Sequence, residues 1–101
     1  MREPDPPSVP WNVKALVAEF ATPTGAPWDE VIGDLWRDRS SSQRVRALVG
    51  DFAFRERVVI PVQARRENGG RTLRIVDGVH RIAAAWALML PVPVHIIEGE
   101  L

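Results

Sequence analysis

The apolar residues in the first half of the chain recur at intervals of three and four, which is the spacing of a helix with one buried face. Three such stripes follow one another: Val13, Leu16, Val17 and Phe20; then Trp28, Val31, Ile32, Leu35 and Trp36; then Val45, Leu48, Val49 and Phe52. Asn12 is a favoured N-cap for the first helix, and Pro27 suits the first turn of the second. Ser40–Ser42 predicts a break, after which a third helix runs from about Ser42 to Phe54.

The period changes to two after the third helix, which is typical of strands. Val58, Ile60, Val62 and Ala64 share one face of a predicted strand. Pro61 has no amide hydrogen to donate to a central ladder, so this strand is expected to start late or to lie at a sheet edge.

The remaining segments predict a hairpin, a helix and a last strand. Glu67–Gly70 contains Asn-Gly, which accepts the positive φ of a tight turn, and Thr72–Val76 forms the return strand. Val79–Leu90 is almost wholly apolar after its first residues, so it predicts a buried helix that Pro91 ends. Val92, Val94 and Ile96 alternate in the last strand.

These elements predict one small mixed α/β (α+β) domain with three to four strands and N-terminal helices. A strand, a helix and a strand at the C-terminus predict a right-handed βαβ unit whose last two strands run parallel. Residues 1–10 contain four prolines and are expected to form a flexible lead-in. Residues 11–41 would form an N-terminal helical segment and residues 42–101 the core, since 101 residues hold one core.

Composition excludes several kinds of chemistry. The chain has no Cys, which excludes disulfides, thiol catalysis, thiolate zinc sites and iron–sulfur clusters. No apolar run reaches the roughly 18–20 residues that span a bilayer. The acidic, proline-rich N-terminus is unlike a signal peptide, so a cytoplasmic location and no membrane partner are expected.

Charge is zero overall but unevenly distributed. Residues 1–36 carry two basic and six acidic side chains, whereas residues 37–81 carry eleven basic and five acidic ones. Twelve of the thirteen cations are Arg, whose planar fork suits phosphate and carboxylate groups. The candidates for a basic face toward a nucleotide or a DNA backbone are Arg44, Arg46, Arg65 and Arg66; a solvated surface is the alternative.

The four tryptophans are expected to fall into two groups. Trp28, Trp36 and Trp86 lie on apolar faces and are expected to pack in the core. Trp11, between Pro10 and Asn12, is expected to be exposed and available to stack on a base or a partner.

The segment Asp77–Arg81 combines a strand end, a glycine turn and a helix start. The first amides of a helix lack internal partners and, with the helix dipole, favour an anion. Gly78 would let a ligand approach the backbone, while His80 and Arg81 add donors beside the amides. Asp77 could hold Mg²⁺ or accept a proton from a hydroxyl. The structural alternative is a common Asp-Gly turn, with Asp77 as a cap and Arg81 in a surface ion pair.

The run Ile75-Val76-Asp77-Gly78-Val79-His80-Arg81, followed by Ala83, Ala84 and the terminal Val92-Pro93-Val94-His95-Ile96-Ile97, resembles the ParB N-terminal/sulfiredoxin-type (ParB-like) domain family. The preceding helix, the strand with Ile60-Pro61-Val62 and the hairpin agree with that family, so the resemblance covers about residues 42–99. In style the run is most similar to ParB-like domains of actinobacterial regulators associated with antibiotic gene clusters.

The resemblance implies that the glycine–His/Arg turn binds the phosphates of a nucleoside triphosphate, CTP or ATP, with Mg²⁺ expected. Gly78, His80 and Arg81 would contact the phosphates. Asp77 matches the acidic position that small-molecule kinases of the family use in catalysis. Sulfiredoxin chemistry requires a cysteine just before the His, and Val79 stands there, so that activity is excluded.

Three functions follow from these observations. The first is a nucleotide-binding ParB-like domain in regulation or DNA transactions. It would reach DNA through a further domain or partner protein, because the helix-turn-helix and dimerisation domains of ParB partition proteins have no counterpart in these residues. The second is a small-molecule kinase or nuclease with Asp77 as base or metal ligand. The third is an interaction module without a ligand, whose Trp28 and Trp36 form a homodimer or partner face.

Overall fold

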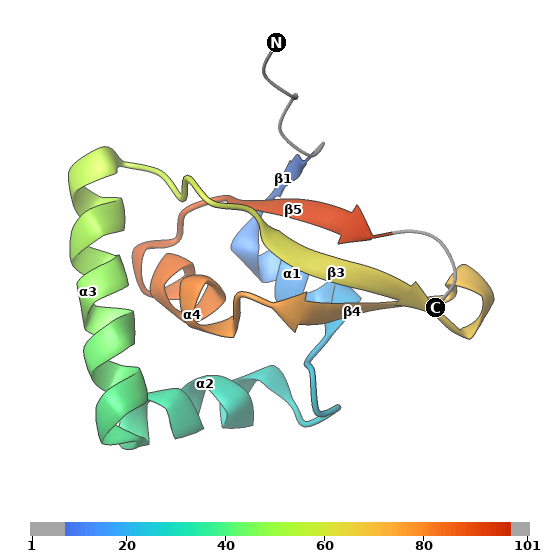
Figure 1. The fold of residues 1–101 in the computed structure, drawn as a ribbon, viewed down its shortest axis with the longest axis horizontal. Coiled ribbons are helices and arrows are strands. Elements are labelled where there is room, and N and C mark those ends of the chain that lie inside the picture. The colour runs from blue at the N-terminus through green and yellow to red at the C-terminus, as the bar shows by residue number, and fades with distance from the viewer. Residues whose placement is uncertain (1–7, 98–101) are drawn as a thin grey trace, which may run out of the picture.

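The computed structural model describes residues 8–97, which form a five-stranded mixed sheet with helices packed against it (Figure 1). The elements in chain order are β1 (Val9–Trp11), α1 (Val13–Glu19), β2 (Phe20–Ala21), α2 (Trp28–Arg37), α3 (Arg39–Arg55), β3 (Val62–Glu67), the 3₁₀ turn η1 (Asn68–Gly70), β4 (Thr72–Asp77), α4 (Val79–Leu88) and β5 (Val92–Ile97). The predicted class, a small mixed α/β domain, is confirmed, with more strands than expected.

β3 lies at the centre of the sheet, whose order is β1-β5-β3-β4-β2. The strand begins at Val62, directly after Pro61. Of the two alternatives that Pro61 left open, the structure has the late start and not the edge position. The proline lies outside the ladder, so β3 can pair along both of its edges.

The predicted parallel pairing of the last two strands is wrong. β3 pairs antiparallel with β4 and parallel with β5, so β4 and β5 run in opposite directions. The tight turn η1, where Asn68 and Gly69 both have positive φ, reverses the chain from β3 into β4. The far edge of β4 pairs with β2, so α4 returns the chain to the open edge of β3.

Two short strands extend the sheet and were not predicted. β1 pairs with β5, and β2 pairs with β4. The predicted lead-in included Val9 and Pro10, but both belong to β1; residues 1–7 of that prediction lie outside the described residues. Trp11 packs edge-on against Phe20, with ring centroids 4.9 Å apart, so its predicted exposure is wrong.

The helix starts follow their capping residues. The Asn12 side chain accepts hydrogen bonds from the amides of Lys14 and Ala15, which confirms it as the N-cap of α1. The predicted break at Ser40–Ser42 is wrong, because the Asp38 side chain accepts the Ser41 amide at 2.8 Å and starts α3 earlier.

The core lies between the helices and one face of the central strands. Its fully buried aliphatic side chains come from α1, α3, α4 and the strands: Val13, Leu16, Val45, Ile82, Val62, Ala64, Ile75, Val92 and Val94. Alternate residues of β3 are buried and exposed, as a strand covered on one face requires. Across residues 8–97, no helix is both long and apolar enough to cross a membrane.

Candidate functional site

The turn at the start of α4 is fixed by its glycine. β4 ends at Asp77, and Gly78 has φ 111° and ψ 21°, a left-handed conformation that side chains disfavour. A Cβ added at Gly78 would lie 2.5 Å from Cγ1 of Val62 in β3. The glycine is therefore required for close packing of α4 on the sheet. The predicted approach of a ligand to Gly78 stays a prediction, since the side that lacks a Cβ faces Val62 while the residue itself lines a cavity.

A cavity of about 520 Å³ opens beside this turn. Its walls are the turn, α2, α3 and the loop before α2, and they contribute Pro23, Thr24, Ala26, Val31, Asp34, Leu35, Arg44, Val76, Asp77, Gly78, Val79 and His80. The cavity thus holds the start of a helix, one guanidinium and one imidazole, together with two carboxylates. Cations and helix amides are the groups that proteins use to bind phosphate.

His80 faces α3 within this cavity. Its Nε2 lies 3.2 Å from the hydroxyl oxygen of Ser41. Burial lowers the pKa of His80 below its usual 6.5, and the positive charge of Arg44 lowers it further, while Asp38 opposes the shift. The imidazole is therefore neutral near pH 7, and a nearby anion would favour its charged form.

Arg81 points to a different place from its neighbour in sequence. Its Nη1 donates to the carbonyl oxygens of Pro61 at 2.7 Å and Ile60 at 3.2 Å, and its Nη2 pairs with Asp77 Oδ2 at 3.0 Å. The Arg81 side chain is 16% exposed. It lines a second, smaller cavity between α3 and the segment before β3 rather than the one that holds His80. The guanidinium thus ties the start of α4 to the start of β3.

Asp77 has one firm partner, since Arg81 occupies its Oδ2. Its side chain is otherwise 64% exposed at the cavity wall. Within residues 8–97, no group of three or more Asp, Glu or His side chains could hold a metal ion. The residues present do not build a metal site of their own, but one or two carboxylates are enough for Mg²⁺ when phosphate oxygens supply other ligands.

The predicted basic face is divided. Arg44 lines the cavity, whereas Arg46, on the same helix, is exposed and does not line it. Arg65 and Arg66 lie in β3 next to the hairpin, at the opposite end of the molecule from α3 (Figure 1). The structure therefore brings one of the four arginines to His80, and the other three form no continuous surface with it.

Sequence reasoning missed the residues that hold the loop at the cavity rim. Arg74 Nη1 donates to the carbonyl oxygen of Thr22 at 2.5 Å, and its Nε donates to Glu67 Oε1 at 2.8 Å. Thr22 is buried, and its hydroxyl donates to the carbonyl of Ala26. Arg74 and Thr22 are 52 residues apart, so no local pattern could have paired them.

No family model matches the chain, and no curated protein matches it. Among solved structures, the crystal structure of sulfiredoxin from Arabidopsis thaliana is similar to this chain, with a TM-score of 0.60 and 21% sequence identity. The match covers 93% of this chain and 88% of that chain. The similarity establishes the sulfiredoxin-type, ParB-like fold. The chain has no cysteine, the residue that the resemblance requires for sulfiredoxin chemistry.

Proposed function

We propose that this protein is a ParB-like domain that binds a nucleoside triphosphate, CTP or ATP, for a regulatory or DNA-transaction role. The phosphates would lie in the cavity at the start of α4. The observation that carries the proposal is that no described side chain caps α4, while its first turn opens onto a cavity shared with Arg44 and His80. An anion there would meet helix amides, a guanidinium and an imidazole together.

The phosphate contacts are assigned differently from the sequence prediction. The first-turn amides, His80 and Arg44 supply the donors. Gly78 sets the turn's direction, and Arg81 holds it against the carbonyls of Ile60 and Pro61. A magnesium ion would arrive with the phosphates, and Asp77, on the cavity wall, is the carboxylate that completes its coordination.

Binding without turnover is favoured over catalysis, because both carboxylates at the cavity are already paired with arginines. Asp77 pairs with Arg81, and Asp34, the second carboxylate at the cavity, pairs with Arg37 at 2.6 Å. A small-molecule kinase is the second candidate, because Asp34 brings a second carboxylate to the same cavity as Asp77. Release of nucleoside diphosphate that persists in the wild type and disappears in Asp77→Asn would favour the kinase.

Calorimetric titration with CTP, ATP and GTP in the presence of Mg²⁺ tests the proposal. Arg44→Ala is expected to weaken binding by about 1.5–3 kcal/mol, the scale of a hydrogen bond to a charged group. Arg46→Ala is the matched control, since it removes the same charge from the same helix outside the cavity. Binding of none of the three nucleotides, or equal losses in the two variants, would contradict the site. A dimer that ignores nucleotides would indicate an interaction module instead.

A further inference from the structure

A third cavity, of about 420 Å³, lies on the face of α2 that is turned away from the cavity holding His80. It is lined by Val17 of α1, by Trp28, Asp29, Ile32 and Gly33 of α2, and by Trp86 of α4. The phosphate cavity contacts α2 through Val31, Asp34 and Leu35 instead, so the helix separates the two cavities. The walls of this third cavity are mostly apolar.

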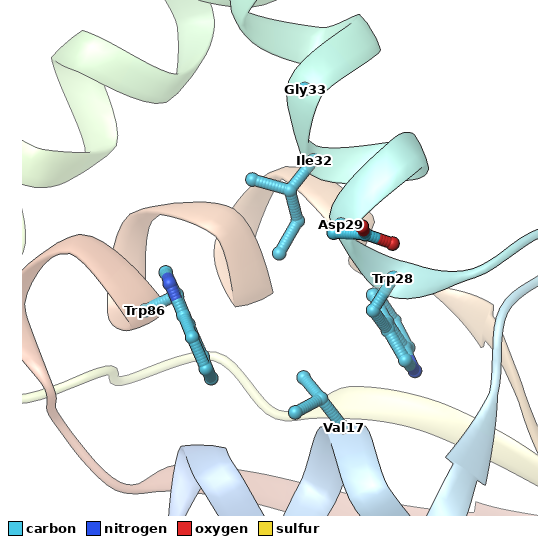
Figure 2. A pocket seen from close by; sticks show the side chains of 6 residues that line it. All are labelled: Val17, Trp28, Asp29, Ile32, Gly33 and Trp86. Carbon is cyan, nitrogen blue, oxygen red and sulfur yellow. The ribbon is translucent and has the colours of Figure 1, made fainter.

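Two indole rings stand on opposite sides of this cavity. Figure 2 shows Trp28 and Trp86 nearly edge-on, with their faces turned toward the space between them and with Val17 and Ile32 closing two further sides. The Nε1 of Trp28 donates to the carbonyl oxygen of Phe20 at 2.7 Å, which fixes the orientation of that ring. Its polar edge is thereby satisfied within the protein, and its π face is left for a ligand.

Trp86 is exposed despite its place on an apolar helix. Its relative exposure is 38%, although the residues just before it, Ala83 to Ala85, are fully buried. The sequence predicted Trp86 and Trp36 as core residues, and both predictions are wrong, since Trp36 is 39% exposed. The Trp86 side chain stands over the cavity and partly in solvent because α2 and α1 leave the space beside it open (Figure 2).

The charged side chain that lines this cavity is acidic. Among the residues that the structure describes, Asp29 is the one charged residue that lines it. The Arg37 guanidinium lies beside Gly33 but is paired with Asp34 at 2.6 Å. Asp29 and Glu30 occupy the first turn of α2, where they offset the positive end of its dipole. Indole faces attract cations through their quadrupole, and a carboxylate at the rim adds to that attraction.

We propose that this cavity binds an organic cation with a quaternary or alkylated ammonium head group. The alkyl groups would contact Val17, Ile32 and the two indole faces, and Asp29 would balance the charge. The cavity is large enough to hold the head group together with part of the chain attached to it. The site is independent of the nucleotide proposal, because none of its lining residues lines the phosphate cavity.

Choline and its uncharged isostere 3,3-dimethylbutan-1-ol test this proposal, with the indole N–H resonances of the protein as the readout. Choline is expected to shift the resonances of Trp28 and Trp86 and to leave those of Trp11 and Trp36 in place. Trp86→Leu should weaken choline binding roughly fivefold or more, the scale of one cation–π contact. Trp36→Leu should leave binding unchanged, because Trp36 is equally exposed but lies outside the cavity.

Asp29→Asn supplies a second variant that alters charge while nearly preserving shape, and it should weaken choline binding without changing the alcohol's. Three results would overturn the proposal. The first is the absence of any choline-dependent shift at Trp28 and Trp86, and the second is equal affinity for the uncharged alcohol. The third is a shift of the same indoles on raising the protein concentration, which would show that a second copy of the chain covers the cavity.

Discussion

The two sides of the first turn of α4 differ although they begin from neighbouring residues. On one side His80 lies in an open cavity with Arg44, and its partner is a single hydroxyl. On the other side Arg81 is fully engaged by two backbone carbonyls and Asp77. One side of the turn therefore holds the fold together, and the other carries the groups that would receive an anion under the proposed function.

The side of the turn that packs against β3 and the segment before it, through Gly78 and Arg81, should be the more sensitive to substitution. Gly78→Ala is expected to have the largest effect. The new Cβ would need a left-handed backbone and would collide with Val62, so the free energy of unfolding should fall by about 2–5 kcal/mol. Gly69→Ala is the control, since Gly69 also has positive φ but nothing lies within 4 Å of its added Cβ. Urea denaturation of both variants gives the comparison, and equal losses would show that the Val62 contact is unimportant.

Arg81→Met should have the next largest effect, and it should act on stability. Removing the guanidinium leaves the Pro61 and Ile60 carbonyls without this donor, so a loss of about 1.5–3 kcal/mol in the free energy of unfolding is expected. Arg57→Met, at an exposed arginine in the segment before β3, should change little. Weaker nucleotide binding with unchanged stability would instead give Arg81 the phosphate contact that its sequence motif suggested.

On the side of the turn that carries His80, the expected effect on stability is smaller and depends on pH. Burial and Arg44 lower the pKa of His80 in the folded state, so the unfolded chain takes up a proton first as the pH falls below about 6.5. Stability should therefore decrease as the pH falls from about 6.5 to the lowered folded-state pKa of His80. Above about pH 6.5 this contribution to stability should be fully retained. Denaturation at several values between about pH 7 and pH 5 measures the slope. His80→Gln should flatten it, and an unchanged slope would assign the effect to other groups.

The elements with strong local signals were predictable from the sequence. The cap at Asn12, the Asn68–Gly69 turn and the apolar helix α4 depend on neighbours within one or two turns of chain, and all three are present. The turn at Asp77–Arg81 was located for the same reason. Features that depend only on residues close together in the sequence can be predicted from the sequence alone.

Features that depend on distant partners were not predictable. β2 has two residues, too few to show any period, and exists because β4 offers it an edge. The direction of Arg81 depends on carbonyls twenty residues away, and that of Arg74 on Thr22. Trp36 and Trp86 lie on apolar helical stripes, but whether such a stripe is covered depends on how the helices pack, so their exposure was missed.

The most direct test of the phosphate site is an NMR titration of the His80 ring against pH, with and without MgATP or MgCTP. Phosphates bound beside the imidazole would stabilise its charged form, so the pKa of His80 should rise from its lowered value when nucleotide is present. His95, on β5, serves as the internal reference, since it does not line the cavity. A His80 pKa that is the same with saturating nucleotide as without it would contradict a phosphate site at the start of α4.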